Sequence, residues 1–296
     1  MMYYKQYWGV MMMITGKTKV LAVIGNPVAH SLSPVFHNAA IRKAGIDYVY
    51  TAFPVDNNRL GEAIAGMKAM GISGLNVTIP HKEQVMKYLD HIDKDAEILG
   101  AVNTIVNRDG VLTGYNTDVK GFLSGMRQIG YEPKGKRALL LGAGGAARAI
   151  IWGLIQEGVA SLTIGVRNVP KVRPLVDYFR KYMEISLLDW STPAFDEALG
   201  QAQLLVNATP LGMYPHVDAM PPVNWDKVPE GILAYDIIYT PAETLFLKTA
   251  KDHGCHTLNG ENMLVGQGAE ALRLWTGIEP DIQVMTEALR HALENK

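Results

Sequence analysis

The 296-residue sequence predicts an α/β fold made of two domains. Three observations lead to this prediction. Short aliphatic runs typical of buried strands alternate with segments of helical periodicity along most of the chain. One of these runs, residues 137–141, ends in a glycine-rich turn that precedes an Ala- and Ile-rich helix. Two helical segments, residues 261–277 and 281–294, follow the last expected strand. We therefore expect parallel or mixed sheets with helices on their faces.

Composition narrows the class of protein. The 48% hydrophobic and 19% charged fractions are typical of a soluble globular chain. A formal net charge of −1 favours neither nucleic acid nor an anionic membrane as partner. Cys255 is the only cysteine, which excludes an internal disulfide and a cysteine metal cluster and favours the cytoplasm. Residues 1–13, rich in Met and aromatics, are expected to be a short extension, since they lack the apolar core of a signal peptide.

The first third of the chain alternates strands and helices. Buried strands are expected at residues 20–25, 48–55 and 74–79. Ser33 followed by Pro34 predicts a helix start with Ser33 as the N-cap. Lys82 is expected to start a later helix, and Asp109-Gly110 predicts a hairpin turn between strands at residues 100–106 and 111–116.

The glycine-rich turn has the spacing Gly142-x-Gly144-x-x-Ala147. In this pattern the first glycine makes a tight turn, the second lets the backbone approach a pyrophosphate, and the small third residue lets the helix lie against the strand. The helix N-terminus then offers N–H groups and partial positive charge to phosphates. The turn predicts a Rossmann dinucleotide-binding domain, although glycine turns without a ligand are also common after strands.

The end of the next expected strand indicates which dinucleotide binds. Residues 162–166 are followed by Arg167-Asn168, where an NAD-binding protein usually has Asp or Glu to hold the ribose 2'-OH. A basic side chain suits a 2'-phosphate instead, and Lys171 adds a second positive charge. The alternative is a solvated surface arginine. We expect NADP as cofactor, with NAD as a secondary one.

Two further groups of polar residues are candidates for substrate chemistry. Ser31 and Ser33 place two hydroxyls beside a helix N-terminus, which suits a carboxylate. Lys82 lies where the helix dipole disfavours a cation, so its position suggests a use. Taken alone, Lys82 is better interpreted as a solvated lysine, and Asp118 as the N-cap of a helix from residue 119. No histidine has the spacing of a metal site, so no metal is expected.

Separated motifs together resemble the shikimate dehydrogenase family. The first four are Ser31-Leu32-Ser33-Pro34, Asn76-Val77-Thr78-Ile79-Pro80-His81-Lys82, Gly100-Ala101-Val102-Asn103-Thr104 and Asn116-Thr117-Asp118. Motifs beginning at Gly142, Asn207, Tyr235 and Asn259 follow in the family's order, so that the resemblance extends from about residue 20 to the C-terminus.

This resemblance implies NADP-linked interconversion of 3-dehydroshikimate and shikimate, in the route to aromatic amino acids. Lys82 and Asp118 would be the catalytic pair. The implied substrate-binding residues are Ser31, Ser33, Thr78, Asn103, Asp118, Tyr239 and Gln267. The implied cofactor-binding residues are Gly142, Ala143, Gly144, Gly145, Ala146, Arg167, Asn168, Lys171, Ile237 and Gly260.

The sequence departs from the family pattern at two positions. Leu32 replaces the lysine that is common between the two serines, as in the quinate/shikimate dehydrogenase subgroup, and Lys171 stands where a second arginine is frequent. A quinate/shikimate dehydrogenase that uses both NAD and NADP is therefore one alternative. A non-catalytic nucleotide-binding regulatory protein is another, although the presence of both Lys82 and Asp118 speaks against it.

The resemblance also implies the domain organisation. We expect a substrate domain of residues 18–118 and 261–296 and a Rossmann domain of residues 119–260, with the C-terminal helices returning to the first domain. The expected partner is the small-molecule substrate, and a homodimer with a second copy of the chain stays open. Neither nucleic acid nor a membrane is expected as partner.

Overall fold

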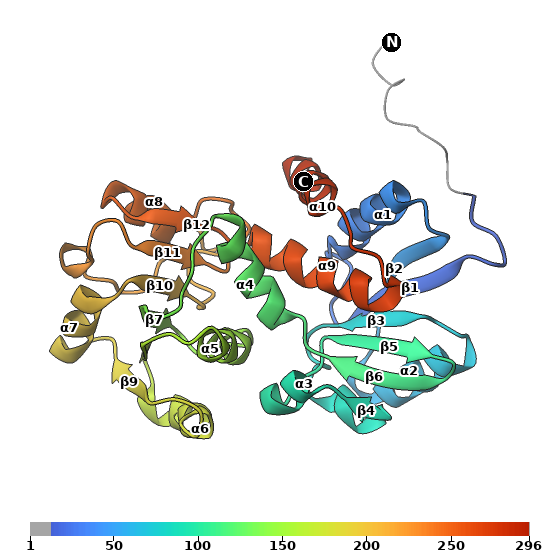
Figure 1. Cartoon of the computed structure of the whole chain (residues 1–296), viewed down its shortest axis with the longest axis horizontal. Coiled ribbons are helices and arrows are strands. Elements are labelled where there is room, and N and C mark those ends of the chain that lie inside the picture. Colours follow the sequence, from blue (N-terminus) through green and yellow to red (C-terminus); the bar gives the residue numbers. More distant parts are fainter. Residues whose placement is uncertain (1–12, 296) are drawn as a thin grey trace, which may run out of the picture. The chain divides into compact units, whose positions relative to one another are not determined.

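The chain divides into two compact units, each built on one six-stranded sheet (Figure 1). The computed structural model describes residues 13–295, so most of the expected N-terminal extension lies outside the described residues. Unit 1 runs up to Thr117 and resumes at Gly268, and unit 2 is Asp118–Gln267. The second boundary lies inside helix α9 (Glu261–Thr276).

Unit 1 contains a mixed sheet of strand order β2-β1-β3-β5-β6-β4. Its strands are β1 (Lys19–Gly25), β2 (Tyr48–Pro54), β3 (Gly74–Val77), β4 (His91–Ile92), β5 (Thr104–Arg108) and β6 (Val111–Tyr115). Its helical elements are α1 (Ser33–Ala44), η1 (Asn57–Arg59), α2 (Leu60–Ala69), η2 (Gln84–Tyr88), α3 (Lys94–Leu99) and α10 (Ile282–Glu294). β1 pairs in parallel with β2 and β3, whereas β5 is antiparallel to both β3 and β6.

Local sequence signals account for several of these boundaries. Gly45 ends α1 with φ +65°, and its N–H donates to the Arg42 carbonyl at 3.2 Å. The predicted hairpin between β5 and β6 is confirmed, since Asp109 and Gly110 both have positive φ in its turn. The expectation that Ser33 is the N-cap of α1 is wrong by one position, because Ser33 is already helical and Leu32 precedes it.

Lys82 does not start a helix. The residues after it form only the short 3-10 helix η2, and Lys82 precedes that element in a turn. Its carbonyl accepts a 2.8 Å hydrogen bond from the backbone N–H of Val102. The Lys82 carbonyl therefore binds a distant segment instead of accepting an i+4 helical hydrogen bond. Local periodicity does not reveal such a long-range contact.

The C-terminal helical residues complete unit 1. Trp275 is 1% exposed and covers β3 at Gly74, where an added Cβ would lie 2.1 Å from the indole nitrogen. The indole N–H donates to the Ile105 carbonyl of β5 at 2.9 Å, and α10 packs against α1. A glycine at position 74 is thus required by the close approach of the indole ring.

Unit 2 contains a fully parallel sheet of strand order β12-β11-β10-β7-β8-β9. Its strands are β7 (Arg137–Leu141), β8 (Ser161–Val166), β9 (Ile185–Asp189), β10 (Leu204–Asn207), β11 (Leu233–Asp236) and β12 (His256–Leu258). Its helical elements are α4 (Asp118–Gln128), α5 (Ala147–Gln156), α6 (Val169–Phe179), α7 (Pro193–Gln201), η3 (Trp225–Lys227), α8 (Leu245–Asp252) and the first part of α9. The strand order reverses beside β7, which is the arrangement of a Rossmann sheet. The predicted α/β fold class is confirmed.

Candidate active site

The glycine-rich turn of unit 2 lies between β7 and α5. Gly142 has φ +88°, and a Cβ at that position would come within 2.6 Å of the Thr209 methyl carbon. Ala146, at the N-cap of α5, has no side-chain oxygen to cap the helix. The turn therefore has the close backbone approach and the open helix N-terminus that a phosphate-bearing ligand requires.

A pocket of about 360 Å³ opens beside this turn, within unit 2. It is lined by Gly142, Ala143, Gly144, Val166, Arg167, Asn168, Lys171, Val172, Trp190, Ala208, Thr209, Pro210 and Leu211. Six of the predicted cofactor residues are in this set; five follow the ends of β7 and β8, and Lys171 lies in the first turn of α6. Ligands of open parallel sheets bind at this edge, next to the point where the strand order reverses.

The basic side of the pocket follows β8. Arg167 and Lys171 are exposed and line the pocket, so both cations are accessible to a ligand. Asn168 also lines it, but its side-chain oxygen accepts the Lys171 backbone N–H at 3.0 Å and thereby caps α6. Asn168 therefore orients the start of α6, which holds Lys171.

The other predicted cofactor residues do not line this pocket. Gly145 and Ala146 belong to the turn before α5. Ile237 and Gly260 lie together, because a Cβ at Gly260 would be 1.9 Å from the Ile237 carbonyl oxygen. Gly260 also donates its N–H to the Ile238 carbonyl at 2.9 Å. Only glycine fits at position 260, so packing alone explains this residue.

Several residues of the pocket are not among those that the sequence predicts. Trp190 follows β9. Its backbone N–H donates to the Val166 carbonyl at 3.2 Å, so Trp190 lies beside the end of β8. Thr209, Pro210 and Leu211 follow β10, the neighbour of β7. Position just after a central parallel strand is the signal that could have identified them.

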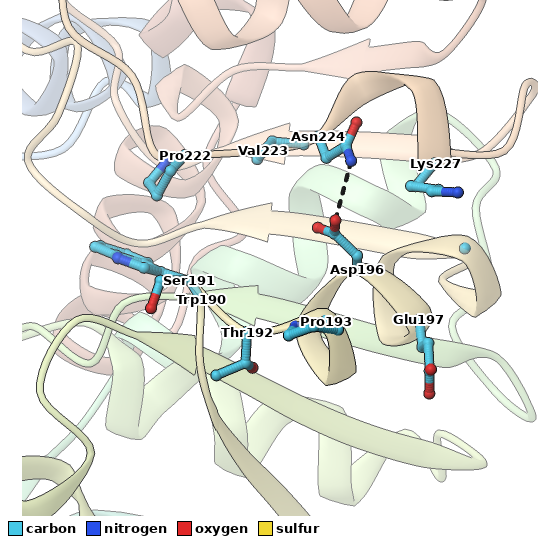
Figure 2. Close-up of a pocket in the computed structure, with 11 residues that line it drawn as sticks. Trp190, Ser191, Thr192, Pro193, Asp196, Glu197, Pro222, Val223, Asn224 and Lys227 are labelled. Carbon is cyan, nitrogen blue, oxygen red and sulfur yellow. Dashed lines mark hydrogen bonds between the residues drawn. The ribbon is translucent and has the colours of Figure 1, made fainter.

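A second hollow in unit 2, of about 750 Å³, lies between α7 and the segment before η3 (Figure 2). Asn224 donates to the Asp196 carboxylate at 3.0 Å across it (Figure 2). Trp190 borders both hollows. No residue of the glycine turn or of the basic strand end lines the larger one. The smaller pocket is therefore the candidate cofactor site, because its chemistry fits a dinucleotide.

The predicted substrate residues of unit 1 lie at the ends of its strands. The N–H of Ser33 donates to the Ser31 hydroxyl at 3.3 Å, which brings these two residues together at the start of α1. Thr78 follows β3 and donates its N–H to the Ile24 carbonyl at 3.0 Å. Its methyl carbon would lie 2.4 Å from a Cβ at Gly25, so Thr78 packs closely against the end of β1.

Two adjacent residues, Val102 and Asn103, hold the backbone at Lys82 and at Thr117. The Val102 N–H binds the Lys82 carbonyl at 2.8 Å. Asn103, 3% exposed, accepts the Thr117 backbone N–H at 2.8 Å on its side-chain oxygen. Thr117 immediately precedes Asp118. Two neighbouring residues therefore fix the backbone at Lys82 and the backbone next to Asp118.

The predicted substrate residues of unit 2 include two on packed helices. Asp118 is the first residue of α4, and one turn later a Cβ at Gly121 would lie 2.8 Å from the backbone nitrogen of Gln267 in α9. This close helix contact places Gln267 beside the first turn of α4. Tyr239 is half-buried, and burial raises the pKa of its hydroxyl.

Two kinds of feature are absent from residues 13–295. No group of three or more His, Cys, Asp or Glu side chains in this part of the chain could hold a metal ion. Among the same residues, no helix is long and apolar enough to cross a membrane.

The reversed strand order, the glycine turn and the basic strand end together define a dinucleotide-binding protein of the Rossmann class. Residues 23–105 match the family model described as the shikimate dehydrogenase substrate binding domain, and residues 260–290 match the shikimate 5'-dehydrogenase C-terminal domain. A shikimate dehydrogenase (NADP(+)) of Caldanaerobacter subterraneus is 43% identical over 94% of this chain and 99% of its own length. The chain belongs to the shikimate dehydrogenase family, which confirms the resemblance seen in its sequence.

Solved structures agree with this assignment. Shikimate 5-dehydrogenase of Listeria monocytogenes, in complex with shikimate and NAD, has a TM-score of 0.90 at 36% identity and covers 95% of this chain and 99% of its own. The Thermus thermophilus enzyme, in complex with NADP(H) and shikimate, has a TM-score of 0.83 at 36% identity and covers 93% and 99%.

Proposed function

We propose that this protein is an NADP-dependent shikimate dehydrogenase that reversibly reduces 3-dehydroshikimate to shikimate. One observation supports it most strongly. Val102 holds the backbone of Lys82, and the next residue, Asn103, holds the backbone that precedes Asp118. A lysine and an aspartate kept by adjacent anchors are suited to act on one substrate group.

The residues have separate tasks in this reaction. NADPH, when bound, supplies the hydride. As negative charge develops on the ketone oxygen, the Lys82 ammonium stabilises that charge and donates the proton. The Asp118 carboxylate accepts a hydrogen bond from a ring hydroxyl. The hydroxyls of Ser31 and Ser33 bind the substrate carboxylate at the start of α1. Thr78, Asn103, Tyr239 and Gln267 bind the rest of the substrate.

The cofactor pocket supports NADP as the preferred dinucleotide. The uncapped N-terminus of α5 suits the pyrophosphate, and Gly142 keeps the preceding turn tight, since a side chain there would collide with Thr209. Arg167 and Lys171 offer positive charge to a 2'-phosphate, and no acidic side chain lines the pocket to accept a ribose 2'-OH. We place the reaction in the cytoplasm, and leave a homodimer as the alternative to a monomer.

An assay of NADP+ reduction with shikimate, and separately with quinate, tests this function. We expect rapid reduction with shikimate and slow or no reduction with quinate, with NADP+ preferred over NAD+. Comparable rates with both acids and both dinucleotides would instead favour a quinate/shikimate dehydrogenase, the alternative suggested by Leu32. Binding of NADP+ without turnover of either acid would indicate a regulatory nucleotide-binding protein.

A further inference from the structure

A row of buried polar groups crosses unit 1 from β2 to β5. Tyr50, 2% exposed, donates its hydroxyl hydrogen to the side-chain oxygen of Asn76 at 2.6 Å. The Asn76 amide nitrogen donates to the Asn103 carbonyl at 3.2 Å and to the Thr104 hydroxyl at 3.1 Å. The Thr104 hydroxyl in turn donates to the Asn103 side-chain oxygen at 2.9 Å. The row therefore begins at Tyr50 and ends at Asn103.

The direction of each hydrogen bond in this row is determined. A carbonyl can only accept, so the Asn103 carbonyl orients the Asn76 nitrogen and directs the Asn76 oxygen toward Tyr50. Tyr50 must then be the donor, and its own oxygen is left as an acceptor. Burial raises the pKa of the Tyr50 hydroxyl, and an interaction with the Ser33 side chain opposes this rise, which places Ser33 beside the Tyr50 oxygen. Ser33 and Asn103 are thus joined through the Tyr50 hydroxyl, although they come from α1 and from the segment before β5.

Packing prevents the Tyr50 ring from moving away. The ring stacks on His37 with centroids 4.2 Å apart and planes 7° apart, and Trp275 lies 6.0 Å from it. His37 is fully buried, and this burial lowers its pKa to about 3, so the imidazole is neutral at physiological pH. A ring held on its face by neutral aromatic groups presents its hydroxyl at one position.

We propose that Tyr50 is a positioning residue for substrate binding: its buried hydroxyl holds Ser33 and Asn103 in the orientation that binds shikimate. This inference rests on the proposed function, which assigns Ser33 and Asn103 to the substrate. Tyr50 acts through these two residues, since its hydroxyl donates to Asn76 and not to a ligand. Removing its hydroxyl leaves the Asn76 oxygen without a donor and frees Ser33 to rotate.

The test is Tyr50→Phe, with Tyr48→Phe as the matched control on the same strand. Loss of one network hydroxyl should raise the KM for shikimate about ten-fold, with kcat changed less than about three-fold. The KM for NADP+ should stay the same, since the cofactor site lies in unit 2. Tyr48→Phe should leave all three constants unchanged. An unchanged KM for shikimate in a folded Tyr50→Phe protein would overturn the proposal.

A double-mutant cycle distinguishes positioning from a general loss of structure. If Tyr50 acts through Ser33, the KM of the Ser33→Ala, Tyr50→Phe protein should rise by much less than the product of the two single effects. Fully multiplicative effects would contradict this. Thr104→Val interrupts the same row at its other end and should also raise the KM for shikimate, which provides the test if Tyr50→Phe does not fold.

Calorimetric titration of shikimate separates this proposal from the proposed function. If the wild-type protein binds and oxidises shikimate but Tyr50→Phe binds it equally well, only the role of Tyr50 fails. If the wild-type protein neither binds nor oxidises shikimate, both the proposed function and the role of Tyr50 are overturned.

Discussion

Each unit has a buried asparagine on a central strand, but the two asparagines have different partners. Asn76 on β3 accepts from the Tyr50 hydroxyl, a neutral donor. Asn207 at the end of β10 donates instead to the fully buried carboxylate of Asp236 at 3.1 Å. Its own side-chain oxygen accepts the N–H and hydroxyl of Thr209, which lines the cofactor pocket. One network supports the proposed substrate residues and the other supports the candidate cofactor pocket.

The difference is one of charge. Burial raises the pKa of Asp236 to about 6, although hydrogen bonds from Thr244, Ile238 and Asn207 oppose this rise. In unit 1 the buried titratable group beside the network is His37, whose pKa burial lowers to about 3. Burial disfavours the charged form of both groups. Falling pH therefore destabilises unit 1 through His37 and stabilises unit 2 through Asp236.

The largest expected effect tests whether the chemistry belongs to unit 1. Lys82→Ala should lower kcat about 10²- to 10⁴-fold in either direction, because the reacting oxygen loses the group that takes up its proton in oxidation and returns it in reduction. The KM for NADP+ should hardly change. Steady-state kinetics with shikimate and NADP+ measure both constants. Lys87→Ala, at an exposed lysine of η2, is the control and should retain wild-type kcat. A near-normal kcat in Lys82→Ala would remove Lys82 from the mechanism.

The second effect concerns the choice of dinucleotide in unit 2. The wild-type protein should prefer NADP+ over NAD+ about 10- to 100-fold in kcat/KM, since a guanidinium pairs with the 2'-phosphate. Arg167→Asp should invert this order, because the new carboxylate repels the phosphate and accepts the ribose 2'-OH. Arg173→Asp, on α6 but outside the pocket, should keep the wild-type preference. Equal preferences in wild type and Arg167→Asp would show that Arg167 does not discriminate.

His37 should make unit 1 sensitive to acid. Its pKa is about 3 when folded and ordinarily 6.5, so the unfolded chain binds more protons between these values. The free energy of unfolding should fall by about 2 kcal/mol as pH drops from 8 to 5 because of this one group. His37→Phe keeps the aromatic stack and should remove this contribution. Denaturant unfolding at both pH values measures it, and an unchanged pH dependence in the variant would refute the assignment.

Asp236 should act in the opposite direction and more weakly. Its folded pKa of about 6 exceeds its ordinary value of 3.8, so its stabilising contribution is complete below pH 3.8 and is lost as pH rises through 6. Between pH 5 and 7 the loss should be about 1.4 kcal/mol. Asp236→Asn removes the titration, and its unfolding free energy should therefore fall less over this range than that of wild type. The same slope in both proteins would exclude Asp236 as the titrating group.

Much of the fold was predictable because local patterns and tertiary contacts agree. The glycine turn at Gly142 and the Asp109-Gly110 turn both have the positive φ values that their sequences favour. The alternation of buried strands and helices gave the α/β class. The Lys82 segment was mispredicted because Val102, twenty residues away, holds its carbonyl. No local periodicity contains that contact.

The candidate site was predictable to a smaller extent. Gly142 and Arg167, which were predicted from the geometry of the turn and from the charge of a 2'-phosphate, line the pocket. Trp190 was missed because a single aromatic after a strand looks like a core residue. Tyr50 was missed because its role depends on contacts with Ser33 and Asn76, which lie on other elements. Those partners become neighbours only through strand pairing of β1 with β2 and β3.

The way Trp275 covers Gly74 has a consequence for biosynthesis. Unit 2 is one continuous stretch of chain, so it has all its residues as soon as Gln267 is made. The sheet of unit 1 is translated earlier, but the indole that covers β3 and the helix that packs on α1 are translated last. During translation, the face of β3 at Gly74 therefore lacks the Trp275 ring until the whole Rossmann unit has been synthesised. Of the two units, the one whose sheet is translated earlier is thus completed later, and a nascent chain stalled before residue 275 would expose this face.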